Sequence, residues 1–377
     1  MNGSAAGPLR VVVLGLSLSS SWGNGHATTF RALLRAFSAR GHDVLFLERD
    51  VPWYAANRDL PEPGFCRFAL YRDLEELAAR WGRAIADADA VILGSYVPEG
   101  IAVGNLVQRV ARGVTAFYDI DTPVTLARIE EGRCDYLAPG QIAGFDLHFS
   151  FTGGPTLDIL RHRYGARRPR VLFCSVDPAA YVPLDVPKRW ALGYLGTYSA
   201  DRQPPLDRLL LEVARRVPDL RFVVAGPQYP ETIDWPANVE RIEHLPPVAH
   251  PAFYAACRYT LNITRADMVR LGHSPSVRLF EAAACGVPVI SDTWEGLESL
   301  FKPEREILLA EDTETVLAAL RGDPDGSRAR HIGAAARERV LAAHTASHRA
   351  AELERHLRDV MRELQGADAP RAEAVAQ

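Results

Sequence analysis

The segment from Gly272 to Ser291 combines residues that can bind an anion with the signals of a short helix. Ser274 suits the N-cap, Pro275 suits the first helical position and Gly286 suits the residue after the helix. A helix N-terminus presents backbone N–H groups without intrahelical partners and the positive end of the helix dipole. Both attract phosphate, so the pattern predicts a diphosphate site at the start of this helix.

Glu281 lies two turns into the predicted helix, on the face that Val277 also occupies. A buried carboxylate there needs hydrogen-bond donors, and the hydroxyl groups of a ribose would supply them. The amides near Ser276 and Val277 would bind the diphosphate, and we place Arg278 in the same set of ligand-binding residues. An ion pair between Glu281 and Arg278, three residues earlier, is the structural alternative.

The turn from Leu195 to Arg202 is a second candidate for binding the same ligand. Gly196 and Thr197 directly follow a predicted strand, and the glycine allows close approach of the backbone. Arg202 can direct its planar guanidinium onto a phosphate. A solvated Arg202 is the alternative interpretation.

The first half of the chain contains a Gly-rich turn, Ser17–His26, between a predicted strand and a helix. Gly23 and Gly25 are candidates for a loop that contacts a second substrate. His26 is a candidate catalytic base, because an imidazole titrates near neutral pH. The turn lacks the G-x-G-x-x-G pattern, which argues against binding of a nicotinamide dinucleotide. A structural turn, with His26 as a helix-capping or surface residue, is the alternative.

Asp119 and Asp121 follow the predicted strand Val114–Tyr118 and therefore lie at a carboxyl strand end, where they are acid/base candidates. Asp119 is our first choice of base. Asp121 is also suited to cap the helix that Thr122 and Pro123 open. The D-x-D spacing could bind a metal–nucleotide complex, but the pair lies in the half of the chain opposite the predicted phosphate site. We therefore predict no metal site.

Short β-branched runs alternate with amphipathic helical segments along nearly the whole chain, which is typical of βαβ units around parallel sheets. The strands expected in the first half are Arg10–Leu16, Asp43–Leu47, Ala90–Gly94, Val114–Tyr118, Asp146–Phe149 and Val171–Cys174. Those expected in the second half are Leu192–Gly196, Arg221–Ala225, Val239–Ile242, Tyr259–Ile263, Val287–Ser291 and Ile307–Leu309. The fold class predicted is α/β, with two Rossmann-like doubly wound parallel-sheet domains that face a cleft.

The stretch from Ser175 to Arg189 interrupts the alternation of predicted strands and helices. It contains three prolines and has no apolar periodicity, so we interpret it as a linker. The predicted N-terminal domain covers residues 8–175, and the predicted C-terminal domain covers residues 190–342. A last helix, over residues 343–365, is expected to pack back on the N-terminal domain.

Composition narrows the class of protein. The 377 residues carry a formal net charge of −4, so no nucleic-acid partner is expected. The five cysteines are odd in number and form no C-x-x-C pair, which argues against a disulfide framework or a structural zinc site and favours the cytoplasm. No apolar stretch approaches the roughly 20 residues of a membrane-spanning helix. We expect a soluble protein, with peripheral membrane contact left open.

The Gly272–Ser291 segment resembles the donor-site helix of twin-Rossmann (GT-B type) retaining glycosyltransferases. That motif has a Glu, seven residues, a second Glu, a run of small residues and Cys-Gly-x-Pro-Val. Glu281 matches the second Glu, which in the family holds the nucleotide ribose, and His273 stands where the first Glu faces the transferred sugar. Three sequence motifs are most similar to those of the CgeB-like (spore-maturation) glycosyltransferases. They are Gly-Thr-Tyr-Ser-x-Asp-Arg at 196–202 and the segments 278–281 and 291–298.

The resemblance implies transfer of a sugar from a nucleotide-sugar donor, a substrate rather than a cofactor, to an unidentified acceptor. The C-terminal half would hold most of the donor, and Arg202 would neutralise the leaving diphosphate without a metal ion. Asp119, or else His26, would accept the proton of the acceptor if the sugar is transferred with inversion. A nucleotide-sugar epimerase of the same fold and a non-catalytic nucleotide-sugar-binding protein are the alternatives.

Overall fold

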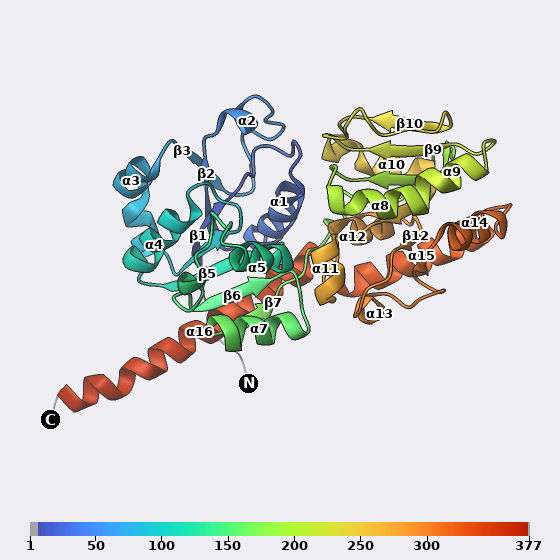
Figure 1. Ribbon diagram of the computed structural model, residues 1–377. Helices are drawn as coiled ribbons and strands as arrows, with labels where there is room; N and C mark the ends of the chain where they lie inside the picture. The colour runs from blue at the N-terminus through green and yellow to red at the C-terminus, as the bar shows by residue number, and fades with distance from the viewer. Residues whose placement is uncertain (1–6, 376–377) are drawn as a thin grey trace. The chain divides into compact units, whose positions relative to one another are not determined.

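The computed structural model describes residues 7–375, with the side chains up to residue 366. The contacts within the chain divide it into two compact units (Figure 1). Unit 1 comprises the chain up to Ser20, Phe30–Leu172 and the part from Ser347 onward, and unit 2 comprises Ser21–Thr29 and Phe173–Ala346. Each unit is built on its own parallel sheet.

Within the described residues, unit 1 contains a seven-stranded sheet with the order β3-β2-β1-β4-β5-β6-β7, and every pairing is parallel. The strands are β1 (Arg10–Gly15), β2 (Asp43–Arg49), β3 (Arg67–Tyr71), β4 (Ala90–Gly94), β5 (Val114–Asp119), β6 (Leu147–Ser150) and β7 (Pro169–Val171). The central strands are apolar and buried along their length, as expected for a sheet that is covered on both faces.

The helices that connect these strands are α1 (Gly25–Ser38), α2 (Pro52–Ala55), α3 (Leu74–Asp87), α4 (Gly100–Val110), α5 (Thr122–Glu130), α6 (Pro139–Ile142) and α7 (Pro155–Tyr164). The last helix of the chain, α16 (Ala346–Val375), contributes ion pairs to unit 1. Its Glu354 pairs with Arg40 at 2.6 Å and its Glu363 pairs with Arg168 at 2.7 Å. Residues about 200 to 300 positions apart in the chain thus stabilise the same unit.

The described part of unit 2 repeats this topology in a six-stranded parallel sheet with the order β10-β9-β8-β11-β12-β13. Its strands are β8 (Trp190–Leu195), β9 (Phe222–Ala225), β10 (Val239–Ile242), β11 (Cys257–Asn262), β12 (Val289–Ser291) and β13 (Leu308–Leu309). The strand order reverses between β8 and β11. In doubly wound sheets, ligands bind beyond the carboxyl ends of the strands at such a reversal.

The helical segments of unit 2 include α8 (Gln203–Leu206), which continues through a π-helical turn (Asp207–Leu211) into α9 (Glu212–Arg216). They further include α10 (His250–Ala256), α11 (Ala266–Leu271), α12 (Val277–Ala284), α13 (Leu297–Leu300), α14 (Thr313–Arg321) and α15 (Ser327–Ala343). No described helix is long and apolar enough to cross a membrane.

The predicted α/β class with two parallel-sheet domains is confirmed, and each expected strand overlaps an observed one. The prediction missed β3 (Arg67–Tyr71), and it placed β7 two residues too late. β3 is an edge strand in which only Tyr71 is fully buried, so it lacks the continuous apolar run by which the central strands are identified.

His148 in β6 is a buried imidazole in the core of unit 1. Its ring packs against Phe117 with the ring centroids 5.3 Å apart, and neither ring nitrogen has a hydrogen-bond partner in the described structure. Burial lowers the pKa of His148 to about 3. The unfolded chain, in which an imidazole has a pKa near 6.5, therefore binds more protons than the folded chain between these two pH values.

We expect the variant His148→Leu to make the protein less sensitive to acid. The neutral imidazole costs no stability above pH 6.5, and the cost grows by about 1.4 kcal/mol for each pH unit below that value. At pH 5 it amounts to about 2 kcal/mol. Urea unfolding at pH 7 and pH 5 measures the difference, which should shrink by this amount in the variant. An unchanged difference would show that His148 is protonated in the folded state.

Candidate functional site

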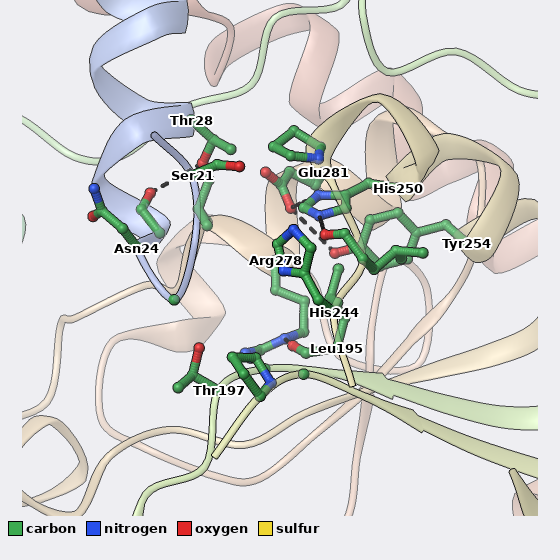
Figure 2. Close-up of a pocket in the computed structure, with 18 residues that line it drawn as sticks. Ser21, Asn24, Thr28, Leu195, Thr197, His244, His250, Tyr254, Arg278 and Glu281 are labelled. Atoms are coloured by element: carbon green, nitrogen blue, oxygen red, sulfur yellow. Dashed lines mark hydrogen bonds and ion pairs between the residues drawn. The ribbon is translucent and has the colours of Figure 1, made fainter. Parts of the chain in front are cut away.

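A pocket of about 650 Å³, including space open to solvent, lies in unit 2 at the carboxyl ends of β8, β9 and β10 and at the start of α12 (Figure 2). All of its lining residues belong to unit 2. They are Ser21, Gly23, Asn24, Gly25, Thr28, Leu195, Gly196, Thr197, Gly226, Pro227, His244, Leu245, Pro247, His250, Tyr254, Val277, Arg278 and Glu281. The pocket therefore brings together seven residues singled out in the sequence: Gly23, Gly25, Gly196, Thr197, Val277, Arg278 and Glu281.

Helix α12 begins two residues later than expected. The N-cap is Ser276, whose Oγ accepts a hydrogen bond from the Arg278 amide at 3.3 Å. Ser274 and Pro275 precede the helix, so the prediction that Ser274 is the N-cap was wrong. Both serines have a side chain suited to capping, and the hydroxyl that reaches a free amide decides where the helix starts. Gly286 follows the helix with a φ of 71°, as predicted for the residue after its end.

The Glu281 side chain is buried, with 3% of its surface exposed. Its Oε1 accepts a hydrogen bond from the Tyr181 hydroxyl at 2.8 Å, and its Oε2 accepts one from the Tyr254 hydroxyl at 3.1 Å. His250 Nδ1 lies 3.8 Å from Oε2 (Figure 2). The structure thus supplies the donors that this carboxylate needs from tyrosines rather than from Arg278. Each carboxylate oxygen can accept a further hydrogen bond on the pocket side.

Arg278 is a buried cation at the wall of the pocket. Its Nε donates to the Leu195 carbonyl, its Nη1 donates to Asn262 Oδ1 at 2.8 Å, and its guanidinium lies 4.9 Å from the centre of the Tyr194 ring. In the described structure it forms no ion pair with a carboxylate, and its Nη2 makes no hydrogen bond. The carboxylate of Asp292 interacts with Arg278 electrostatically but forms no direct ion pair with it. A buried guanidinium that keeps unused N–H groups at a pocket wall indicates a site for an anion.

The carboxyl ends of β8 and β9 approach each other closely at two glycines. Gly226 has a φ of 144°, and a Cβ atom there would overlap the carbonyl oxygen of Gly196. Only glycine fits this position, because other residues rarely adopt such a φ and their side chains would need the occupied space. Gly226 was not among the site residues predicted from the sequence. The signal was present in the strand-to-turn sequence Ala225-Gly226-Pro227.

Three residues of the predicted donor set, namely Arg202, His273 and the N-cap residue Ser276, lie outside the lining of the pocket. Arg202 donates from Nη2 to the Thr197 carbonyl at 2.6 Å, which fixes the turn after β8. His273 has a left-handed backbone with a φ of 50°, its amide donates to the Glu295 carbonyl at 2.6 Å, and its ring lies 3.7 Å from Glu295 Oε1. Arg202 therefore contacts the pocket lining at Thr197, whereas His273 contacts Glu295, which is not a lining residue.

Asp119 and Asp121 lie in unit 1, at the end of β5 and the start of α5. Asp119 is fully buried, and its Oδ1 accepts hydrogen bonds from Thr125 Oγ1 at 2.9 Å and from the Asp121 amide at 3.2 Å. Burial raises the pKa of Asp119 to about 7, so this carboxyl exchanges its proton near neutral pH. Asp121 occupies the N-cap position of α5 without a capping hydrogen bond from its side chain, which accepts one from Tyr96 instead.

His26 lies in the first turn of α1 and is not among the residues that line the pocket. Asn24 Oδ1 accepts a hydrogen bond from the His26 amide at 3.0 Å, so the capping side chain is Asn24. Burial lowers the pKa of His26 to about 3. The expectation that His26 titrates near neutral pH was therefore wrong, because it assumed a solvated imidazole.

Comparisons with known proteins identified one family model and several solved structures that resemble this chain. Residues 202–355 match a family model described as glycosyl transferase-like. Sucrose-phosphate synthase from Thermosynechococcus elongatus is 16% identical, with a TM-score of 0.69 over 93% of this chain and 99% of that chain. HepE from Anabaena, in complex with UDP and glucose, is 13% identical, with a TM-score of 0.70 over the same shares of the two chains. A comparison with curated protein sequences found no match.

A glycosyltransferase from Rickettsia africae shows the same likeness at 10% identity, with a TM-score of 0.66 over 94% of this chain and 98% of that chain. At such identities the structural likeness defines the fold alone. The predicted GT-B fold is confirmed by it.

Proposed function

We propose that this protein is a glycosyltransferase that takes its sugar from a nucleotide-sugar donor bound in the pocket of unit 2. The match of residues 202–355 to a glycosyl transferase-like family model supports this proposal. The observation that carries this proposal is Arg278, a buried cation with two unused Nη2 hydrogens beside the N-terminus of α12. A diphosphate would neutralise this charge. Its oxygens would accept hydrogen bonds from the guanidinium and from the backbone amides at the helix N-terminus.

The same groups account for how transfer would be accelerated. Negative charge grows on the departing diphosphate as the bond to the sugar breaks, so donors fixed around it stabilise the transition state more than the ground state. Arg278 and the amides of α12 are held in place before the reaction, which avoids the cost of reorganising them. Arg202, in the neighbouring turn, would add positive charge at longer range.

Glu281 is proposed to hold the ribose of the donor. Its carboxylate lines the pocket and keeps acceptor capacity beyond its two bonds from tyrosines. The structurally similar HepE was solved with UDP and glucose, which makes UDP the first nucleotide to test. That the chain belongs to the CgeB-like subgroup is a hypothesis based on its sequence motifs.

For the acceptor side we keep Asp119 as the proposed base of an inverting transfer. Its pKa of about 7 suits a group that must accept a proton near neutral pH, whereas His26, with a pKa of about 3, is a much weaker base. In a retaining transfer the leaving phosphate would take the proton, and neither residue would be required. The acceptor is an unidentified hydroxyl or a similar nucleophile.

The proposal is tested by thermal shift with UDP, GDP, ADP and their glucose conjugates. Binding of one family of nucleotides should raise the melting temperature, by an amount that grows with ligand concentration. Turnover is then followed as release of nucleoside diphosphate. Binding without release would favour a nucleotide-sugar-binding protein, and conversion of the sugar with donor alone would favour an epimerase.

A second arm of this experiment tests the role of metal ions. We expect donor consumption to continue in excess EDTA, because a guanidinium and a helix N-terminus neutralise the diphosphate. Loss of activity that manganese or magnesium restores would contradict this and would direct attention to Asp119 and Asp121.

A further inference from the structure

The Glu281 carboxylate belongs to a hydrogen-bond chain that reaches His250 through Tyr181. We propose that this hydrogen-bond chain holds one additional proton, compared with a state in which Glu281 is ionised and His250 is neutral. His250 then acts as a positioning residue that keeps the donor-binding carboxylate electrically compensated and links donor affinity to pH. The inference rests on the proposed function, because it concerns the same pocket.

The argument is a count of protons and acceptors. The Tyr181 oxygen lies 2.8 Å from Glu281 Oε1 and 3.1 Å from His250 Nδ1, and its hydroxyl has a single proton. His250 Nε2 lies 3.2 Å from the Leu245 carbonyl, which can only accept, so Nε2 carries a proton.

Two arrangements satisfy these contacts. If Tyr181 donates to Glu281, then His250 Nδ1 must donate to Tyr181, and the imidazole is protonated on both nitrogens. If Tyr181 donates to Nδ1 instead, then Glu281 must donate to Tyr181 and is a carboxylic acid. Both arrangements contain the same additional proton. Without it, two lone pairs would face each other at hydrogen-bond distance in a buried site.

The surroundings contain few other charges. His250 begins α10 and is faced by Tyr181 from the linker, by Tyr254 one turn later and by Glu281 from α12. Burial raises the pKa of both tyrosines far above neutral, so both stay protonated.

Arg278 on α12 and Cys285 at the C-cap of α12 are further titratable groups near Glu281. Burial raises the pKa of Cys285 to about 12, so this thiol stays neutral. Arg278 is the cation of this group of residues. The shared proton therefore decides whether Glu281 and His250 together are neutral or carry one negative charge.

The consequence is a pH-dependent affinity for an anionic ligand. Once the proton is lost, the wall of the pocket gains a negative charge close to the expected diphosphate, and affinity should fall as pH rises. Linkage to a single proton limits the decrease to about tenfold for each pH unit.

The first experiment uses the protein without nucleotide at pH 7. Imidazole ¹⁵N NMR signals, assigned with His250→Gln, report the protonation of His250. The infrared carboxyl band, assigned with Glu281→Gln, reports that of Glu281. One proton beyond the Nε2 hydrogen should be found on one of the two groups. An ionised Glu281 together with a neutral His250 would overturn the proposal, whether or not any nucleotide binds.

The second experiment measures UDP, GDP and ADP binding by calorimetry from pH 6 to pH 9. The affinity of the wild type should decrease with rising pH more steeply than that of His250→Gln, which lacks the shared proton. The ionisation of the nucleotide itself is common to both proteins. Equal slopes would overturn the proposal, whereas absence of binding at every pH, with the shared proton present, would count against the proposed donor site alone.

Tyr254→Phe is the matched control. It removes one hydroxyl from Glu281, as Tyr181→Phe does, but the Tyr254 hydroxyl is not part of the path to His250. Tyr254→Phe should lower the affinity at all pH values but keep the pH dependence of the wild-type affinity. Tyr181→Phe should lose that pH dependence. The same loss of slope in both variants would assign the effect to general disturbance of Glu281.

Discussion

The variant Arg278→Met is expected to lower the affinity for nucleoside diphosphates at least 100-fold. Methionine preserves much of the buried aliphatic part of the side chain, but it removes the positive charge of Arg278 at the pocket wall and the two unused hydrogens of Nη2. Hydrogen bonds to charged groups contribute about 1.5–3 kcal/mol each, so two of them correspond to a loss of at least about 3 kcal/mol. Calorimetry with UDP and the other nucleoside diphosphates measures this directly.

Two controls separate phosphate recognition from damage to the fold. The nucleosides without phosphate should bind wild type and Arg278→Met with similar affinity. Arg202→Ala removes a nearby guanidinium that does not line the pocket, and we expect it to lower turnover more than donor binding. If Arg278→Met bound diphosphates as the wild type does, Arg278 would be a structural residue and the proposed function would lose its main support.

The variant Gly226→Ala is expected to destabilise unit 2 by about 3 kcal/mol or more and to close the donor pocket. Its backbone has a φ of 144°, which costs a non-glycine residue about 1–3 kcal/mol. The added Cβ would also overlap the Gly196 carbonyl, so the ends of β8 and β9 must separate. Thermal unfolding should show a melting temperature lower by about 6 °C or more.

Gly25→Ala is the matched control, because Gly25 also lines the pocket and no atom lies within 4 Å of the position its Cβ would take. Its backbone is not left-handed, so alanine fits without strain. We expect its stability to change by less than about 0.5 kcal/mol. Equal stability of Gly226→Ala and Gly25→Ala would mean that the β8 and β9 ends adjust freely, and the close approach at Gly196 would then have no role in shaping the pocket.

Local sequence patterns were sufficient to predict the features that depend on neighbours along the chain. Strand and helix periodicities, the breaks at glycine and proline, and the end of α12 at Gly286 involve residues within a turn of each other, so their signals are local. The positions of Glu281 on α12 and of Asp119 at the carboxyl end of β5 followed from the same local patterns.

Tertiary structure alone decided what surrounds these residues. The donors to Glu281 come from Tyr181, 100 residues earlier, and from Tyr254, 27 residues earlier, and no local pattern relates such positions. The orientation of Arg278 away from Glu281 depends on acceptors at Leu195 and Asn262.

Burial likewise changed which of the two candidate bases has a pKa near neutral. In water the imidazole of His26, rather than the carboxyl of Asp119, would be the group that titrates near neutral pH. Burial moves the pKa of Asp119 up to about 7 and that of His26 down to about 3. Desolvation disfavours whichever form is charged, and its extent is set by packing that only the folded chain possesses. The sequence thus determined which residues could take part in the chemistry, and the fold decided their partners and protonation.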